Sequence, residues 1–270
     1  FCMSIYKIDD ENEIYYQYKQ PQNSGFTCVF VNALTGDLST WTGDIGEKLL
    51  SNGNGYLAYN LRGQNKSKFG KDLILDDKLI VSDLLKLIDY IKPKNIILIG
   101  LSIGGLYASM ALEKGLDAKG IVLINTLRKP SERLNWINNA MLNAIKLGGT
   151  NLILDMVMPV MASPNFLKKL QNDALKYENY LGLEDYDGLS KLMYGGFTAN
   201  WNFNWNIIKI PSLIMTGYYD KVFRVPKDID EIVLEIKNAI RIEVKECGHL
   251  IPLENPKLFS YHLLGFINSI

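Results

Sequence analysis

The stretch that decides the fold is residues 95–115, "NIILIGLSIGGLYASMALEKG". Its first six residues are mostly apolar and rich in isoleucine, which predicts a short strand buried on both faces. Residues 103–115 have a helical pattern that ends at Gly115, a residue type that commonly ends helices. Ser102 lies at the junction, in the middle of the pentapeptide "GLSIG".

The glycines on either side of Ser102, Gly100 and Gly104, fit a sharp turn from strand to helix. Such a turn strains the backbone at the serine and crowds its neighbours, where any Cβ atom would clash. It also presents the hydroxyl at the amino end of the helix, where free N–H groups favour a developing oxyanion. A serine that only caps the helix is the alternative. The strand before it and the helix after it favour a nucleophile.

A serine hydroxyl needs a neighbouring base to become a nucleophile, and the chain has two histidines. His249 follows the last predicted strand, at the sheet edge where Ser102 is also expected, whereas His262 lies in the final predicted helix. Asp220 follows the preceding strand at the same edge, where a carboxylate can orient the imidazole. A solvated turn residue is the alternative for Asp220. We therefore predict a catalytic triad of Ser102, Asp220 and His249.

Strand and helix patterns alternate through the first half of the chain and again after residue 206, which predicts parallel strands with helices on both faces. Two β-rich runs, 3–8 and 13–18, precede this pattern. We predict a doubly wound, mostly parallel eight-stranded sheet, formed by residues 1–127 and 207–270. A helical cap of residues 128–206 is expected between the sixth and seventh strands. Insertions of this kind usually cover a site, although a purely structural insertion is the alternative.

The cap contains predicted helical segments at 133–147, 151–161, 164–182 and 188–197. It is rich in apolar and aromatic residues, some of which must belong to its core. We predict that a minority line a mainly apolar substrate pocket, and the candidates are Trp136, Met158, Phe197 and Trp201. Arg128 and Arg133, at the entrance to the cap, are weak candidates for binding a substrate carboxylate.

Charge and cysteine content exclude several classes of protein. Lys and Arg together number 29, as do Asp and Glu, so no basic surface for nucleic acid or an anionic membrane is expected. The three cysteines form no metal-ligand or disulfide pattern, which fits a cytoplasmic protein. No apolar run approaches the length of a membrane span. We expect no metal, no cofactor, and either a monomer or a homodimer.

These landmarks resemble the α/β-hydrolase fold family along nearly the whole chain. The resemblance rests on the strand–serine–helix turn, the acid after the predicted cap, and the segment "GHLIPLENP" around His249. It implies that the loop "FVNALTGDLSTW" carries an oxyanion hole, formed by the backbone N–H groups of Leu34 and Ile103. Asn32 and Asn60 depart from the histidine and aspartate usual in this family, which alters supporting hydrogen bonds rather than the triad.

The chain looks most like the capped serine esterases and enol-lactonases of this family. The resemblance implies acyl transfer through the triad, on a small, mainly apolar carboxylic ester or lactone. Two alternatives stay open. One is hydrolysis of a C–C bond in a diketone-like compound with the same triad, and the other is a non-catalytic member that only binds a ligand.

Overall fold

The computed structural model describes residues 4–270, so Cys2 and the first residue of the predicted strand 3–8 lie outside the described residues. In these residues eight strands form one sheet in the order β1-β2-β4-β3-β5-β6-β7-β8. They are β1 (Ser4–Lys7), β2 (Glu13–Lys19), β3 (Thr27–Val31), β4 (Gly55–Tyr59), β5 (Ile96–Leu101), β6 (Gly120–Ile124), β7 (Ser212–Gly217) and β8 (Ala239–Val244). Only the β1–β2 and β2–β4 pairs are antiparallel. The predicted mostly parallel, eight-stranded sheet is confirmed.

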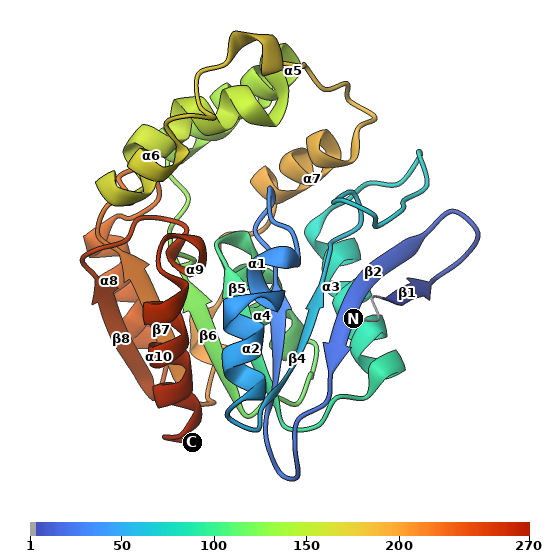
Figure 1. Cartoon of the computed structure of the whole chain (residues 1–270), viewed down its shortest axis with the longest axis vertical. Helices are drawn as coiled ribbons and strands as arrows, with labels where there is room; N and C mark the ends of the chain where they lie inside the picture. Colours follow the sequence, from blue (N-terminus) through green and yellow to red (C-terminus); the bar gives the residue numbers. More distant parts are fainter. Residues whose placement is uncertain (1–3) are drawn as a thin grey trace.

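Helices cover both faces of this sheet (Figure 1). One layer contains α3 (Asp77–Ile91), α4 (Ile103–Glu113) and α8 (Pro226–Glu235). The opposite layer contains α1 (Ser39–Thr42), α2 (Asp44–Leu50), α9 (Ile251–Glu254) and α10 (Pro256–Ile267). Because both faces are covered, every residue of β3, β5 and β6 is buried, which explains their continuous apolar runs.

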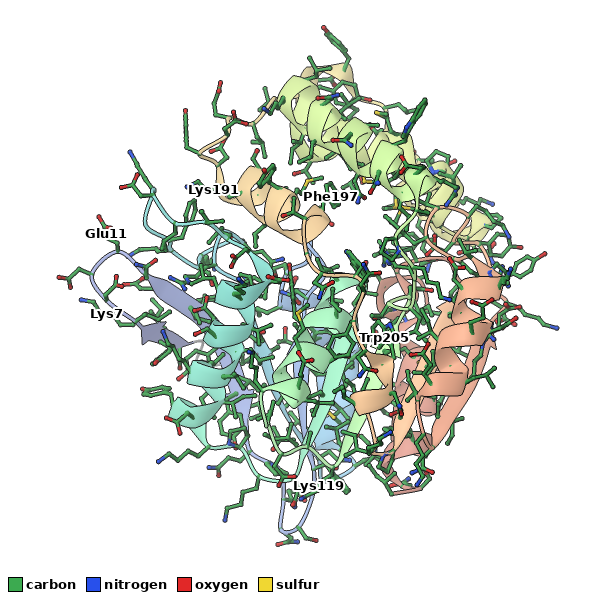
Figure 2. All side chains as sticks on the ribbon, turned by 180° about the vertical axis from the view of Figure 1, so that it is seen from behind. Lys7, Glu11, Lys119, Lys191, Phe197 and Trp205 are labelled. Carbon is green, nitrogen blue, oxygen red and sulfur yellow. The ribbon has the colours of Figure 1, made fainter. Side chains whose placement is uncertain are left out.

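The chain between β6 and β7 forms a separate layer over the carboxyl ends of the strands (Figure 1). It contains α5 (Glu132–Met161), α6 (Pro164–Leu170), the 3-10 turn η1 (Tyr177–Asn179), α7 (Gly188–Phe197) and the 3-10 turn η2 (Trp205–Ile207). We call this layer the cap. Its last segment returns to the sheet, where Phe203 and Trp205 pack edge to face in the core. Figure 2 labels Trp205. These two aromatic residues are therefore structural.

The helix α5 consists of two helical parts joined at Gly148 and Gly149, which both have non-helical backbone angles. Gly149 has a φ of +62°, and a Cβ atom there would lie 2.1 Å from the carbonyl oxygen of Leu181. The break agrees with the two separate helical segments predicted from the sequence. By length and composition alone α5 could cross a membrane. In this fold the interrupted helix forms one wall of the cap.

The predicted helix 164–182 is wrong beyond Leu170, where α6 ends. Leu175 adopts a left-handed backbone with φ of +56°, and its N–H donates to the Asp155 carboxylate at 2.8 Å. The hydroxyl of Tyr180 donates to the same carboxylate oxygen at 2.9 Å. Contacts with α5 therefore hold this segment in an irregular conformation and override its local helical preference.

Candidate active site

Ser102 lies in the sharp turn predicted between β5 and α4. Its backbone angles, φ 56° and ψ −122°, lie outside the helical and strand regions, and α4 begins at the next residue. Such a conformation costs about 1–3 kcal/mol and is found mainly at functional sites. The Ser102 N–H donates to the carbonyl of Ile124 on the neighbouring strand at 2.7 Å, and the Thr126 hydroxyl donates to the Ser102 carbonyl at 2.9 Å. These two bonds fix the strained turn from the β6 side.

The two glycines of the motif are required by close packing. A Cβ atom on Gly104 would lie 2.2 Å from the carbonyl oxygen of Val31 on β3. A Cβ atom on Gly100 would lie 2.3 Å from the backbone of Gly105, in the helix that follows the turn. The expected clash is therefore present at both positions, against a neighbouring strand for Gly104 and against α4 for Gly100.

His249 and Asp220 form a buried pair. His249 Nδ1 lies 2.6 Å from Asp220 Oδ2, and the two residues are 3% and 1% exposed. The second carboxylate oxygen accepts the N–H groups of Val222 at 3.1 Å and Phe223 at 2.9 Å. A proton on Nδ1, facing the carboxylate, leaves Nε2 as the basic nitrogen. Sequence reasoning named this pair, and the structure places it at the sheet edge where it was expected.

The electrostatics of Asp220 favour its charged form. Burial alone would raise the pKa of this carboxyl group. The charge and hydrogen bond of His249, the N–H of Phe223 and the charge of Arg128 together lower the pKa below its ordinary value. Asp220 is therefore an anion that can stabilise a positive charge on the imidazole.

The loop that carries His249 is held by a buried carboxylate that sequence reasoning did not identify. Glu254 accepts the N–H groups of Gly248 at 2.9 Å and Leu250 at 3.1 Å, on either side of His249. It also accepts the N–H of Ser163 at 2.9 Å, from the cap. The only sequence signal was its place in the segment "LENP", which follows His249 closely.

Asn125, directly after β6, is a second support that was missed. Its side-chain amide donates to the carbonyls of His249 at 2.8 Å and Gly248 at 3.1 Å, and its oxygen accepts the N–H of Gly217 at 2.9 Å. Asn125 has a φ of 50°, a conformation that asparagine tolerates better than most residues. It therefore joins the histidine loop to the strand that precedes Asp220.

The end of α5 also contacts both loops. The carbonyl of Met161 accepts the N–H of His249 at 2.6 Å, and the carbonyl of Val160 accepts the N–H of Lys221, next to Asp220, at 2.8 Å. A Cβ atom on Gly248 would lie 2.0 Å from the same Met161 oxygen. The glycine before His249 is thus required because the cap helix approaches the backbone at this point.

The loop predicted to carry an oxyanion hole is held by Gln64. The Gln64 amide donates to the carbonyls of Ala33 at 2.7 Å and Leu34 at 2.9 Å. Ile103 opens α4, and in residues 4–270 its N–H and that of Leu34 donate to no protein group. Leu34, Ile103 and Ser102 line one cavity. Both residues therefore border the cavity, and their N–H groups have no acceptor in the described chain.

Asn32 and Asn60, the two residues that depart from the family pattern, both form hydrogen bonds with identified partners. Asn32 donates to Gln64 Oε1 at 3.0 Å and accepts the indole N–H of Trp41 at 2.7 Å. Asn60 accepts the N–H of Leu38 at 2.7 Å and donates to Asp37 at 3.0 Å. Both asparagines thus support the loop predicted to carry the oxyanion hole, and the bond from Asn60 goes to a carboxylate.

The Ser102 hydroxyl accepts a hydrogen bond from Arg128 Nη2 at 3.0 Å. In the described part of the chain it makes no hydrogen bond with His249, although both residues line the same cavity. A hydroxyl oxygen that accepts from arginine can still donate its own proton. Arg128, named only as a weak candidate from the sequence, therefore contacts the predicted nucleophile directly.

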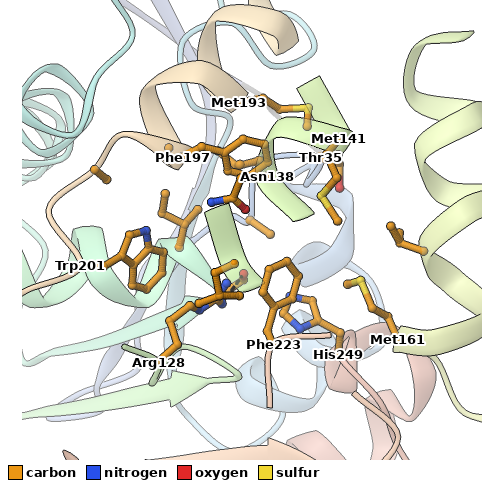
Figure 3. A pocket seen from close by; sticks show the side chains of 18 of the residues that line it. Thr35, Arg128, Asn138, Met141, Met161, Met193, Phe197, Trp201, Phe223 and His249 are labelled. Atoms are coloured by element: carbon orange, nitrogen blue, oxygen red, sulfur yellow. Dashed lines mark hydrogen bonds between the residues drawn. The ribbon is translucent and has the colours of Figure 1, made fainter. Parts of the chain in front are cut away.

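A cavity of about 450 Å³ opens between the sheet edge and the cap (Figure 3). Ser102 and His249 lie on its floor, and its walls are mainly apolar, with Met141, Met161 and Phe197 among them. This volume suits a small organic ligand. A second cavity of about 540 Å³ adjoins it under α6 and shares Met158 with it.

Three of the four predicted pocket residues line the cavity, and the fourth does not. Met158, Phe197 and Trp201 line the cavity. Trp136 does not, and it is 79% exposed. Arg133 is also exposed, and its guanidinium donates to the carbonyls of Lys221 and Val222 rather than facing the cavity. The pocket role of Trp136 and the carboxylate-binding role of Arg133 are therefore wrong. Within residues 4–270 no cluster of three or more His, Cys, Asp or Glu side chains is arranged to hold a metal.

Comparison with known proteins identifies the family. The family model described as the alpha/beta hydrolase fold matches residues 28–256. The chain belongs to the α/β-hydrolase fold family, as its motifs and sheet order indicated. No curated protein matches the chain in sequence.

Solved structures of this fold are similar over almost the whole chain. An α/β-hydrolase enzyme from a Medee basin deep-sea metagenome library has a TM-score of 0.83 at 23% identity, covering 98% of this chain and 97% of its own. An esterase from Exiguobacterium antarcticum has a TM-score of 0.81 at 17% identity, with coverages of 98% and 99%. The enol-lactonase from Burkholderia xenovorans LB400 has a TM-score of 0.77 at 21% identity, with coverages of 96% and 98%. At these identities the likeness establishes the fold.

Proposed function

We propose that this protein is a serine hydrolase that cleaves a small, mainly apolar carboxylic ester or lactone. One observation carries the proposal. Ser102, His249 with its imidazole oriented by Asp220, and the residues Leu34 and Ile103 all line one mainly apolar cavity. Nucleophile, base and oxyanion donors are the three components that acyl transfer requires.

The proposed reaction begins when Ser102 attacks the substrate carbonyl and its proton moves to His249 Nε2. The resulting oxyanion accepts hydrogen bonds from the two backbone N–H groups, while Asp220 stabilises the imidazolium. The imidazolium then gives its proton to the leaving alkoxide, and an acyl-enzyme remains on Ser102. Water, activated by the same imidazole, hydrolyses this ester and restores the free serine.

Substrate size follows from the cavity. The space above Ser102 is about 450 Å³, and its walls carry methionine, leucine and aromatic side chains. Flexible methionine side chains adapt to ligands of different shape. The adjoining cavity of about 540 Å³ gives room for one substituent of the ester to extend past Met158. A short acyl group or a small lactone is therefore the substrate class that we propose.

The test is covalent labelling with a fluorophosphonate probe, followed by assays with short esters, lactones and vinylogous diketones. We expect the wild type to be labelled and to hydrolyse esters or lactones, and Ser102→Ala to lose both properties. Ser109→Ala is the matched control, because among residues 4–270 the Ser109 hydroxyl donates only to the Gly105 carbonyl, within α4. A wild type that neither reacts with the probe nor hydrolyses any compound of the panel would contradict the proposal. Cleavage of the diketones alone would favour the C–C hydrolase.

Location and assembly are proposed alongside the reaction. We expect a cytoplasmic protein that binds small molecules rather than nucleic acid or membranes, and that acts as a monomer or a homodimer. Size-exclusion chromatography with light scattering distinguishes the two assemblies.

A further inference from the structure

Arg128 is a buried cation beside the candidate nucleophile, and it has no carboxylate partner among residues 4–270 at ion-pair distance. It is 6% exposed. Asp220 contributes a favourable charge, but its two oxygens are engaged by His249 and by backbone N–H groups. Burying a guanidinium without a partner is unfavourable, so a buried and unpaired arginine calls for a functional explanation.

In the described chain only part of the Arg128 guanidinium is hydrogen-bonded to protein groups. Nη2 donates to Ser102 Oγ at 3.0 Å and to the carbonyl of Asn125 at 2.9 Å, and Nε donates to the carbonyl of Thr126 at 3.3 Å. Nη1 donates to no group of the described chain. Nη1 is not fully buried, and Arg128 is one of the residues that line the cavity. Two N–H donors are therefore free to bind a ligand.

Aromatic rings fix the orientation of the guanidinium (Figure 3). Its central carbon lies 4.5 Å from the ring centre of Trp201, which follows α7, and 4.3 Å from that of Phe223, which follows Asp220. Cation–π contacts of this kind hold an arginine in place without neutralising its charge. The free edge of the fork is thus presented to the cavity in a fixed direction.

The charge of Arg128 is also the dominant charge of the cavity. Among the described residues that line it there is no Asp, Glu or Lys, and the other polar side chains are mostly amides and hydroxyls. Burial lowers the pKa of Arg128 to about 10, with the charge of Asp220 opposing the shift. At neutral pH the group is therefore still protonated, and the mainly apolar cavity carries one positive charge.

We infer that Arg128 forms a carboxylate-binding subsite and that the substrate is an ester or lactone that carries a free carboxylate near the scissile carbonyl. This inference deepens the proposed function and rests on it. Because Nη2 already touches Ser102, an anion on Nη1 lies only a few bonds from the carbonyl under attack. A half-ester of a short dicarboxylic acid has this arrangement, with its remaining carbon chain against the apolar walls.

The first test compares ethyl hydrogen succinate with ethyl levulinate, in which a methyl ketone replaces the carboxylate. The two esters have the same length, so the ratio of their kcat/KM values reports the contribution of the charge. We expect the wild type to prefer the anionic ester, and Arg128→Met to reduce that ratio on the order of 10- to 100-fold, as for the loss of a charged hydrogen bond. Acid release in a pH-stat measures both rates.

Two further variants control the comparison. Arg241→Met removes an arginine that is paired with Asp230 outside the cavity, and it should keep the wild-type ratio. Arg128→Lys keeps the charge but loses the planar fork, and we expect an intermediate ratio. Should neither Arg128 variant fold, the wild-type preference between the two esters still decides the question.

A binding measurement separates this inference from the proposed function. Succinamate, in which an amide replaces the ester, is titrated calorimetrically into the Ser102→Ala protein, with levulinamide as the neutral control. Binding of succinamate that is lost on Arg128→Met, together with a wild type that neither reacts with the probe nor hydrolyses any ester, would leave the anion subsite standing and overturn the hydrolase. Equal hydrolysis of both esters, with no succinamate binding, would leave the hydrolase standing and overturn the subsite.

Discussion

At the scale of single residues, burial and hydrogen bonding act in opposite directions on the pKa of Asp220. One oxygen faces His249 and the other accepts two backbone N–H groups, so all of its principal bonds favour the anion. These partners outweigh burial and lower the pKa of the carboxyl group. The native state therefore binds a proton at this site less readily than the unfolded chain does.

The lowered pKa of Asp220 makes the stability of the protein depend on pH. A carboxyl group whose pKa is lowered on folding stabilises the protein above its unfolded pKa, which is about 3.9 for aspartate, and this stabilisation disappears as the pH falls through the folded value. We expect the stability difference between the wild type and Asp220→Asn to shrink as the pH is lowered from 6 towards 3. Urea unfolding midpoints at several pH values measure it. A difference that grows towards low pH would contradict the assigned pKa direction.

At the scale of elements, the loop after β3 depends on one side chain from the loop after β4. Gln64 fixes the carbonyls of Ala33 and Leu34, and through them the direction of the Leu34 N–H. Asn32 in turn bonds to Gln64, which links the side chain to the core. A backbone donor contributes to catalysis only when it is preorganised, so the proposed oxyanion hole needs this support.

We expect Gln64→Leu to lower kcat by about 10-fold or more, with a smaller effect on KM, because a displaced oxyanion donor weakens transition-state binding selectively. Steady-state kinetics on the best ester of the panel measure both constants. Gln22→Leu, at an exposed position, is the control and should match the wild type. An unchanged kcat in a folded Gln64→Leu protein would remove Gln64 from the oxyanion-hole proposal.

The elements around Ser102 could be predicted from the sequence, whereas the contacts between distant loops could not. The strand, the turn at Ser102 and the following helix could be predicted because their signal is local: an apolar run, two glycines and a helical pattern. The supporting roles of Asn125 and Glu254 could not, because each depends on loops that meet only in the folded chain. The contact between Arg128 and Ser102 has the same origin.

The error at Trp136 has a different cause. Composition indicated an apolar pocket but not which side of α5 faces it. Leu134, Asn138 and Met141, at helical spacing, line the cavity, and Trp136 points away from that face. Knowledge of which side of α5 faces the cavity would have excluded Trp136. Because this helix carries apolar residues on several sides, that side becomes clear only in the folded cap.

At the scale of the whole molecule, Glu254 connects the histidine loop and the cap through three backbone N–H groups. Glu254→Leu leaves these buried donors without an acceptor, and each costs about 1–3 kcal/mol. We expect a loss of stability of about 3 kcal/mol or more together with reduced turnover, whereas Glu246→Leu, at an exposed position, should change neither. Thermal unfolding and ester hydrolysis measured on the same samples test this coupling. Loss of stability with full turnover would show that the loop keeps His249 in place without Glu254.

The final turn of α5 has a practical consequence for engineering this enzyme fold. Its Val160 and Met161 carbonyls bind the loops that carry Asp220 and His249, so this turn supports the proposed catalytic groups although it lies in the insertion. A chimera that exchanges the entire insertion for that of a relative would replace two anchors of the proposed reaction centre along with the walls of the cavity. Grafts that stop before Val160 change the walls and leave the anchors native. The useful boundary for transferring substrate preference thus lies inside a helix, not in the loop where the insertion ends.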